Sequence, residues 1–231
     1  MQEIVDEMIA SREHRIDQMM ARFTDSRFRG RRRDDGGTGY LPLLGAAKNV
    51  SVAYAPVTNE EFAKFTGKAI APGTERLPVT DISYSAAISY CEWLNARDSA
   101  HTYRLPTEDE WELAAGHMPK DADFNCGVGD KVLPVDTYKD TKGACGGIDF
   151  WGNCWEWTST KHKDGGHIVK GGAFDSKRTD CRTEARSEAR KPKSGYPNVT
   201  LRLIREDRNA NQQDDLSHGD AESRRHPPPP P

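Results

Sequence analysis

The sequence predicts an α+β domain in which short capped helices lie between aromatic-rich extended segments. Residues 48–56 alternate in polarity and end at a proline, as a strand does. Helix starts are marked by three hydroxyl residues, Thr58, Ser83 and Thr107. Residues 148–157 hold three of the five tryptophans, and aromatic side chains favour sheets. These patterns predict the elements but not how they are arranged.

The composition predicts one domain of ordinary size with polar additions. The chain has 231 residues, of which 35% are hydrophobic and 30% charged, so part of it is expected to lie outside the core. A net charge of −3 argues against a general nucleic-acid binder. No apolar run approaches the roughly 18 residues of a membrane span. The N-terminus lacks a secretory apolar region, so a cytoplasmic protein is expected.

We expect four segments, three of which follow from composition. Residues 1–28 are expected to form an amphipathic helix that packs on the domain or self-associates, rather than one that lies on a membrane. Its apolar stripe consists of Val5, Ile9, Ile16, Met20 and Phe23. Residues 29–45 have the composition of a linker, residues 46–206 form the domain, and residues 207–231 are a polar and proline-rich tail that is expected to be disordered.

Each predicted helix of the domain has a cap and a buried face. The helix after Thr58 is expected to reach Phe65, and the helix after Ser83 to span about residues 84–97. The helix after Thr107 carries a capping-box glutamate three residues on and an apolar face beyond it. We assign these helices to the core and give them no chemistry.

Five segments, in the same order, resemble motifs of one family. They are residues 56–62, 78–93, 103–112 (YRLPTEDEWE), 152–157 (GNCWEW) and 169–174 (VKGGAF). The last three are similar to the YRLPTEAEWE, GNVWEW and VRGGSW motifs of the formylglycine-generating-enzyme, or sulfatase-modifying-factor, superfamily. The resemblance covers about residues 50–206. It implies an irregular, C-type-lectin-like α+β fold, which periodicity alone does not give.

The resemblance also implies where catalysis would occur. Catalytic members of this family oxidise a cysteine of a client sulfatase, using copper held by a Cys-x4-Cys pair that follows the two glycines. Soft Cu(I) prefers two thiolates. Here Cys181 stands at the second position and Ser176 at the first. Because a serine hydroxyl is hard and stays protonated near neutral pH, copper is not expected, and an oxidase with an unidentified second ligand is only the alternative.

Two other branches of the family remain. One holds iron in an H-x3-H-x-E site, a pattern that none of the seven histidines makes. The other is non-catalytic and displays a ligand-binding surface on its C-terminal half, as variable proteins of diversity-generating retroelements do. Those proteins end in Gly-Phe-Arg, where this chain has Thr200-Leu201-Arg202. We therefore expect a non-catalytic protein that binds a protein or other ligand.

The expected binding surface spans residues 171–196. Its candidate residues are Phe174, Asp175, Lys177, Arg178, Asp180, Arg182, Glu184, Arg186 and Arg190. Propensity alone favours a helix over residues 178–191, whereas the resemblance implies an extended segment, which we adopt. The arginines then suit carboxylate or phosphate groups, and the alternative is a salt-bridged, solvated face.

The resemblance also implies a structural calcium ion, with Asn153 and Glu156 as its candidate ligands. If it binds no metal, Glu156 either pairs with a cation or faces solvent, because a buried carboxylate needs a cation or several hydrogen-bond donors. Oxygen-bearing side chains nearby also suggest calcium, although they lack EF-hand spacing. They are Asp121, Asp123, Asn125, Asp130 and Asp149.

The five cysteines are odd in number and form no C-x-x-C, so free thiols are expected rather than disulfides or a zinc site.

Overall fold

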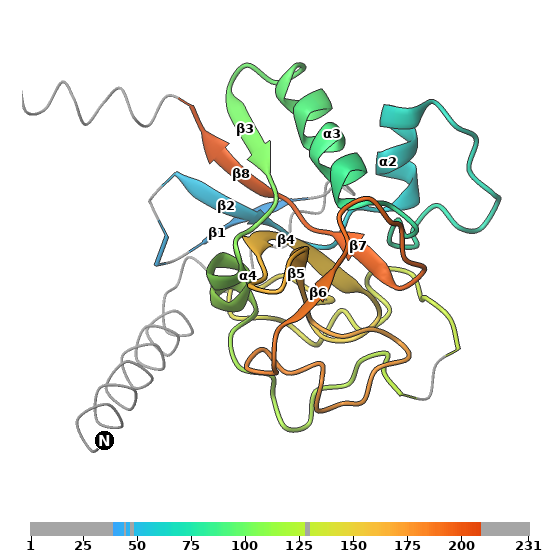
Figure 1. Cartoon of the computed structure of the whole chain (residues 1–231), viewed down its shortest axis with the longest axis vertical. Coiled ribbons are helices and arrows are strands. Elements are labelled where there is room, and N and C mark those ends of the chain that lie inside the picture. The colour runs from blue at the N-terminus through green and yellow to red at the C-terminus, as the bar shows by residue number, and fades with distance from the viewer. Residues whose placement is uncertain (1–38, 44, 47–48, 128–129, 209–231) are drawn as a thin grey trace, which may run out of the picture.

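The computed structural model describes residues 39–43, 45–46, 49–127 and 130–208 (Figure 1). The predicted N-terminal helix and nearly all of the predicted tail lie outside these residues. Within them, the elements are β1 (Tyr40–Pro42), β2 (Val50–Ala53), α2 (Asn59–Thr66), α3 (Tyr84–Asn95), β3 (His101–Arg104), α4 (Glu108–Ala115), β4 (Trp155–Lys161), β5 (His167–Lys170), β6 (Glu188–Arg190), β7 (Val199–Leu201) and β8 (Ile204–Asp207). The predicted mixture of helices and sheets is confirmed.

The first sheet joins the two ends of the described chain. Its strand order is β1-β2-β8-β3, and every pair is antiparallel. Strands β2 and β8, from opposite ends, lie side by side (Figure 1). Residues 29–45 were predicted to be a linker, but strand β1 lies within that range. The glycines before it gave the segment a linker composition, yet Tyr40 and Leu41 pair with β2.

The second sheet carries the aromatic stretch at its centre. Its order is β6-β5-β4-β7, with β4 and β7 parallel and the other pairs antiparallel. Residues 155–158 of β4 are all buried, without alternation. A strand covered on both faces needs no polar side, which explains why residue alternation was a weak signal here.

The three helices begin where their capping residues predict. Thr58 and Thr107 each form a capping box with a glutamate three residues later, and the Ser83 side chain accepts a hydrogen bond from the Ala86 N–H. Each cap satisfies donors that the first helical turn leaves unpaired. None of the helices in the described part of the chain has the length and apolar character needed to cross a membrane.

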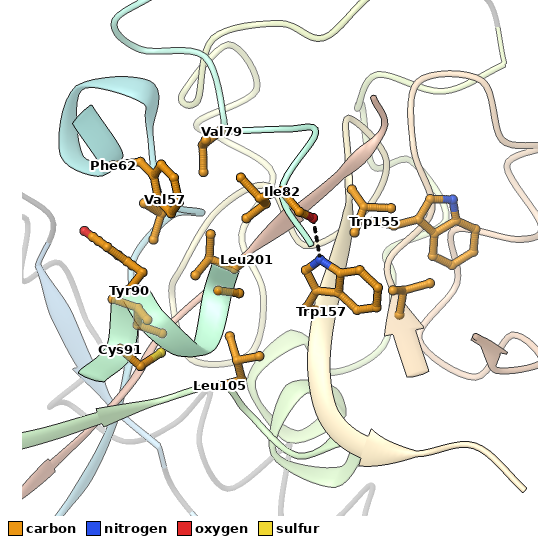
Figure 2. Packing of buried hydrophobic residues seen from close by; sticks show 14 of the residues in the cluster. Val57, Phe62, Val79, Ile82, Tyr90, Cys91, Leu105, Trp155, Trp157 and Leu201 are labelled. Atoms are coloured by element: carbon orange, nitrogen blue, oxygen red, sulfur yellow. Dashed lines mark hydrogen bonds between the residues drawn. The ribbon is translucent and has the colours of Figure 1, made fainter. Parts of the chain in front are cut away.

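The largest apolar cluster packs α2 and α3 against the second sheet. Figure 2 shows Phe62, Tyr90 and Cys91 from the helices facing Trp157 and Leu201 from the strands. The Trp157 indole N–H donates to a backbone carbonyl, the oxygen of residue 82, at 3.2 Å. Its ring is therefore buried without leaving a polar atom unpaired. This cluster fixes β4, which carries the centre of the site.

Residues 178–191 are not helical, as the resemblance implied. They form turns followed by β6. The buried Thr183 explains the conformation, because its hydroxyl accepts from the Trp151 indole N–H at 3.0 Å and donates to the Gly116 carbonyl. These long-range bonds tie the segment to the domain and outweigh its helical propensity.

Candidate functional site

A buried ion pair lies at the centre of the domain. Glu156 and Arg202 are both 0% exposed, and two hydrogen bonds join them: Nε to Oε2 at 2.9 Å and Nη2 to Oε1 at 2.7 Å. The Trp111 indole N–H also donates to Glu156 Oε2, at 2.7 Å. Of the three environments considered for Glu156, the structure gives the ion pair. Sequence reasoning did not identify Arg202 as the partner.

Asn153, the second residue expected to bind calcium, joins two loops through its side-chain hydrogen bonds. Asn153 Oδ1 accepts from the side chain of Asn125 at 3.1 Å and from the Leu133 N–H at 2.9 Å. Its amide nitrogen donates to the Leu133 carbonyl at 3.0 Å. Asn153 and Glu156 therefore already have protein partners for their side-chain oxygens. Among the described residues, no three His, Cys, Asp or Glu side chains gather as a metal site. Calcium binding at this pair stays a prediction.

Asp149 differs from the other acidic loop residues because it is buried. It is 7% exposed, and one carboxylate oxygen, Oδ2, has no hydrogen-bond partner. Burial raises the pKa of this carboxyl to about 7, against the opposing effect of Arg202. Asp149 therefore carries a proton far more readily than an exposed aspartate does.

Ser176 and Cys181, which stand at the positions of the family's two copper ligands, make different hydrogen bonds. Ser176 Oγ accepts a hydrogen bond from the Ala173 N–H at 3.0 Å, so its hydroxyl closes a turn. Cys181 is 0% exposed, and its thiol donates to the Lys177 carbonyl at 3.5 Å. Burial raises the pKa of Cys181 to about 12. Both side chains are therefore engaged in hydrogen bonds within the domain.

A different cysteine lies near Cys181. All five cysteines are free thiols, and the side chain of Cys126 adds to the effect of burial in raising the pKa of Cys181. Cys126 belongs to the glycine-rich loop that follows α4, far from Cys181 along the chain. Sequence reasoning missed this proximity because loop packing, not spacing, creates it.

Several residues of the expected binding surface are held by contacts within the domain. Arg178 donates to the Lys120 and Ala122 carbonyls at 3.2 and 2.7 Å, and both oxygens of Asp175 accept from Asn198. Arg190 pairs with Glu188 at 2.8 Å and lies over two aromatic rings. Phe174 is partly buried, Asp180 accepts from the Thr179 hydroxyl, and Glu184 lies 3.8 Å from His117. These contacts indicate that Arg178 and Arg190 stabilise the fold rather than bind a ligand.

Three basic side chains of this surface remain unpaired within the described part of the chain. Lys177, Arg182 and Arg186 are exposed, and no salt bridge or side-chain hydrogen bond there engages them. Arg186 borders a hollow of about 440 Å³. The hollow is lined by His162, Asp180 and residues 185–189. An unpaired guanidinium group that lines a concave surface suits an anionic group of a ligand.

A buried lysine anchors the wall of this hollow. Lys170 is 3% exposed, donates to Glu112 at 2.8 Å and lies 3.4 Å from Glu108. The Ser187 hydroxyl, which lines the hollow, donates to the same Glu108. The loop is therefore tied to α4 through a charged cluster. A second hollow, of about 240 Å³, lies against α2 and contains none of the predicted site residues.

Two known proteins are similar in sequence to part of this chain. Hercynine oxygenase of Mycobacterium tuberculosis is 32% identical over 99 residues, which is 36% of this chain and 22% of that protein. Inactive C-alpha-formylglycine-generating enzyme 2 of Mus musculus is 29% identical over 117 residues, 41% of this chain and 35% of that protein. The matches thus span about a third or less of these relatives' own lengths.

Solved structures share the fold at low identity. Treponema denticola variable protein 1 has a TM-score of 0.55 and 17% identity, covering 73% of this chain and 91% of that one. PvdO from Pseudomonas aeruginosa has a TM-score of 0.57 and 18% identity, covering 74% and 91%. The sequence profile described as "Sulfatase-modifying factor enzyme 1-like domain" matches residues 47–207. The chain therefore belongs to the sulfatase-modifying-factor, or formylglycine-generating-enzyme, family.

Proposed function

We propose that this protein is a non-catalytic, ligand-binding member of the family. The observation that carries the proposal is the unpaired guanidinium group of Arg186, which lines the hollow of about 440 Å³, with a second exposed and unpaired arginine, Arg182, four residues before it. The ligand is a protein or other molecule that presents carboxylate or phosphate groups. Guanidinium forks bind such groups with two parallel hydrogen bonds.

The chemistry of the copper positions supports a binding role. Ser176 replaces the first thiolate, and its hydroxyl serves a turn. A catalytically inactive relative and a variable protein of the same fold are compatible with this role. The charged cluster around Lys170 supports it further, because a loop anchored to a helix loses less conformational entropy when a ligand binds.

The test uses a fluorescein-labelled hexaglutamate peptide as an anionic probe and fluorescence anisotropy as the readout. We expect Arg182→Glu and Arg186→Glu each to weaken binding by roughly tenfold, about 1.4 kcal/mol. Lys64→Glu is the matched control, because Lys64 is an exposed basic residue on α2, away from this surface. A hexalysine peptide controls for charge. Equal weakening by all three variants would indicate nonspecific attraction and contradict the proposal.

A copper-dependent oxidase is the second candidate, and the proximity of Cys126 to Cys181 is the observation that favours it. An oxidase would convert the cysteine of a sulfatase-derived peptide to formylglycine, detected as a mass change. Conversion that is lost in Cys181→Ala would replace the binding proposal. No conversion by the copper-loaded wild type would leave the binding proposal in place.

A further inference from the structure

Strand β6 lies at the edge of the second sheet, so one side of its backbone has no neighbouring strand (Figure 1). Its central residue, Ala189, lies opposite Ile168 of β5. In an antiparallel pair, the backbone groups of successive residues point alternately toward the partner strand and away from it. The direction of the Ala189 groups therefore decides whether this edge presents a free N–H.

Hydrogen bonds within the sheet give this direction. The Ile168 carbonyl accepts from the Thr158 hydroxyl of β4 at 2.9 Å, so the backbone groups of Ile168 point toward β4 and away from β6. Ala189 and Ile168 are therefore a non-hydrogen-bonded pair, in which the groups of the two residues point away from each other. On the free side of β6, the Ala189 carbonyl accepts from the Arg190 guanidinium at 3.2 Å, whereas the Ala189 N–H has no partner among the described residues. The Arg190 carbonyl faces β5, because a Cβ added at Gly166 would lie 2.5 Å from its oxygen.

The other edge strands have features that protect their free sides. In β3, the side chain of Asn95 bonds both the Tyr103 N–H, at 2.6 Å, and the Tyr103 carbonyl, at 3.0 Å. In β7, the Leu201 carbonyl accepts at 3.0 Å from a backbone N–H of the segment before α2. Strand β1 contains Pro42, which has no N–H. Native sheets commonly protect their edges in such ways, whereas nothing in the described part of the chain covers the Ala189 N–H.

Unpaired basic side chains lie at both ends of β6. Arg186 precedes the strand and lines the hollow beside it. Lys191 and Lys193 follow the strand, are exposed, and form no salt bridge with any residue that the structure describes. Of the acidic side chains that line the hollow, Glu188 is paired within the strand and Asp180 accepts a hydrogen bond from its neighbour. A partner that lies along this edge therefore meets positive charge at both ends, which favours acidic side chains.

We propose that the ligand is an extended, acidic peptide segment that pairs with β6 as an added strand. An open sheet edge with a free N–H suits a peptide backbone, and the flanking basic side chains suit its carboxylates. The proposal rests on the ligand binding proposed above, and it specifies the chemistry and the conformation of that ligand.

Strand addition engages the two backbone groups on the free side of Ala189. The Ala189 N–H donates to a carbonyl of the added segment, and a peptide N–H takes the place of the Arg190 guanidinium at the Ala189 carbonyl. These main-chain bonds do not depend on the sequence of the peptide, so the charged side chains select the ligand. Arg186 binds a carboxylate of the peptide through its guanidinium fork. A small carboxylate without a peptide backbone makes only this last interaction.

The first test varies the peptide. Fluorescence anisotropy measures the binding of a fluorescein-labelled peptide of three Glu-Val repeats to the full chain. A second peptide has the same sequence with every backbone nitrogen methylated, so it keeps the charge and loses the N–H groups. We expect it to bind roughly tenfold more weakly, because it cannot pair with β6.

The second test varies the strand. Ala189→Pro removes the free N–H without removing a bond to β5, and proline is tolerated on edge strands. This variant should bind the unmodified peptide roughly tenfold more weakly than the wild type does. Ala189→Ser keeps the N–H and is the matched control, which should bind as the wild type does. In the wild type, the peptide should also slow hydrogen exchange of the Ala189 N–H.

Several outcomes would overturn strand addition. They are equal affinity for the two peptides, unchanged binding in Ala189→Pro, and tighter binding of inorganic polyphosphate than of the peptide. Exchange of the Ala189 N–H that the peptide leaves unchanged would also overturn it, and this measurement on the wild type decides the matter if Ala189→Pro does not fold. If Arg186→Glu still weakens peptide binding in these cases, the proposed function stands without strand addition. If the peptide does not bind at all, both fail.

Discussion

The pair of Glu156 and Arg202 concentrates charge where no solvent reaches it. Removing one partner leaves an unpaired buried charge, so we predict that Arg202→Met lowers the free energy of unfolding by about 3–5 kcal/mol. Glu156→Gln combined with Arg202→Met removes both charges and keeps an acceptor for the Trp111 N–H. Urea denaturation should find this double variant more stable than the single one. A double variant that is less stable would contradict the assignment.

Asp149 makes stability depend on pH. Its pKa is about 7 in the folded protein and about 4 in an unfolded chain. Between these values the folded state holds a proton that the unfolded state has lost, so stability falls as pH rises from 4 to 7. Asp149→Asn should remove this fall, at about 1.4 kcal/mol per pKa unit, and Asn tolerates the positive φ of 57°. Urea denaturation at pH 5 and 8 checks this; an unchanged pH dependence in Asp149→Asn would contradict it.

At the scale of the element, α4 connects the core to the proposed binding surface. Its capping box starts at Thr107, Trp111 reaches the central ion pair, and Glu108 and Glu112 hold Lys170. Thr107→Ala should cost about 1 kcal/mol of stability and raise hydrogen exchange in the first turn of α4. Ser89→Ala, on the exposed face of α3, is the control and should change stability by less than about 0.5 kcal/mol. Equal effects of the two variants would argue against the cap.

The elements that could be predicted from the sequence are those with local signals. The helices α2, α3 and α4 each follow a capping residue that needs only its own first turn. Strand β1 was missed because its three residues follow a glycine-rich segment, and only pairing with β2 defines it. Strands β3 and β8 likewise depend on each other across the domain.

At the scale of the whole molecule, long-range contacts determine the candidate site. The partner of Glu156 is Arg202, and Cys126 lies near Cys181. Neither arrangement follows from spacing, because each joins loops or strands that only the completed fold brings together. The motifs predicted the family and the surface of residues 171–196, whereas the structure distinguished its unpaired arginines from its structural ones. The hollow beside Arg186 was not predictable from residue types.

NMR mapping with the hexaglutamate peptide shows directly whether this surface binds an anionic ligand. In ¹H–¹⁵N spectra of the full chain, we expect the largest shifts at residues 180–189 and His162, around the hollow. The same spectra of Arg186→Glu should show much smaller shifts. Shifts confined to the hollow against α2, or no shifts at millimolar peptide, would contradict the account.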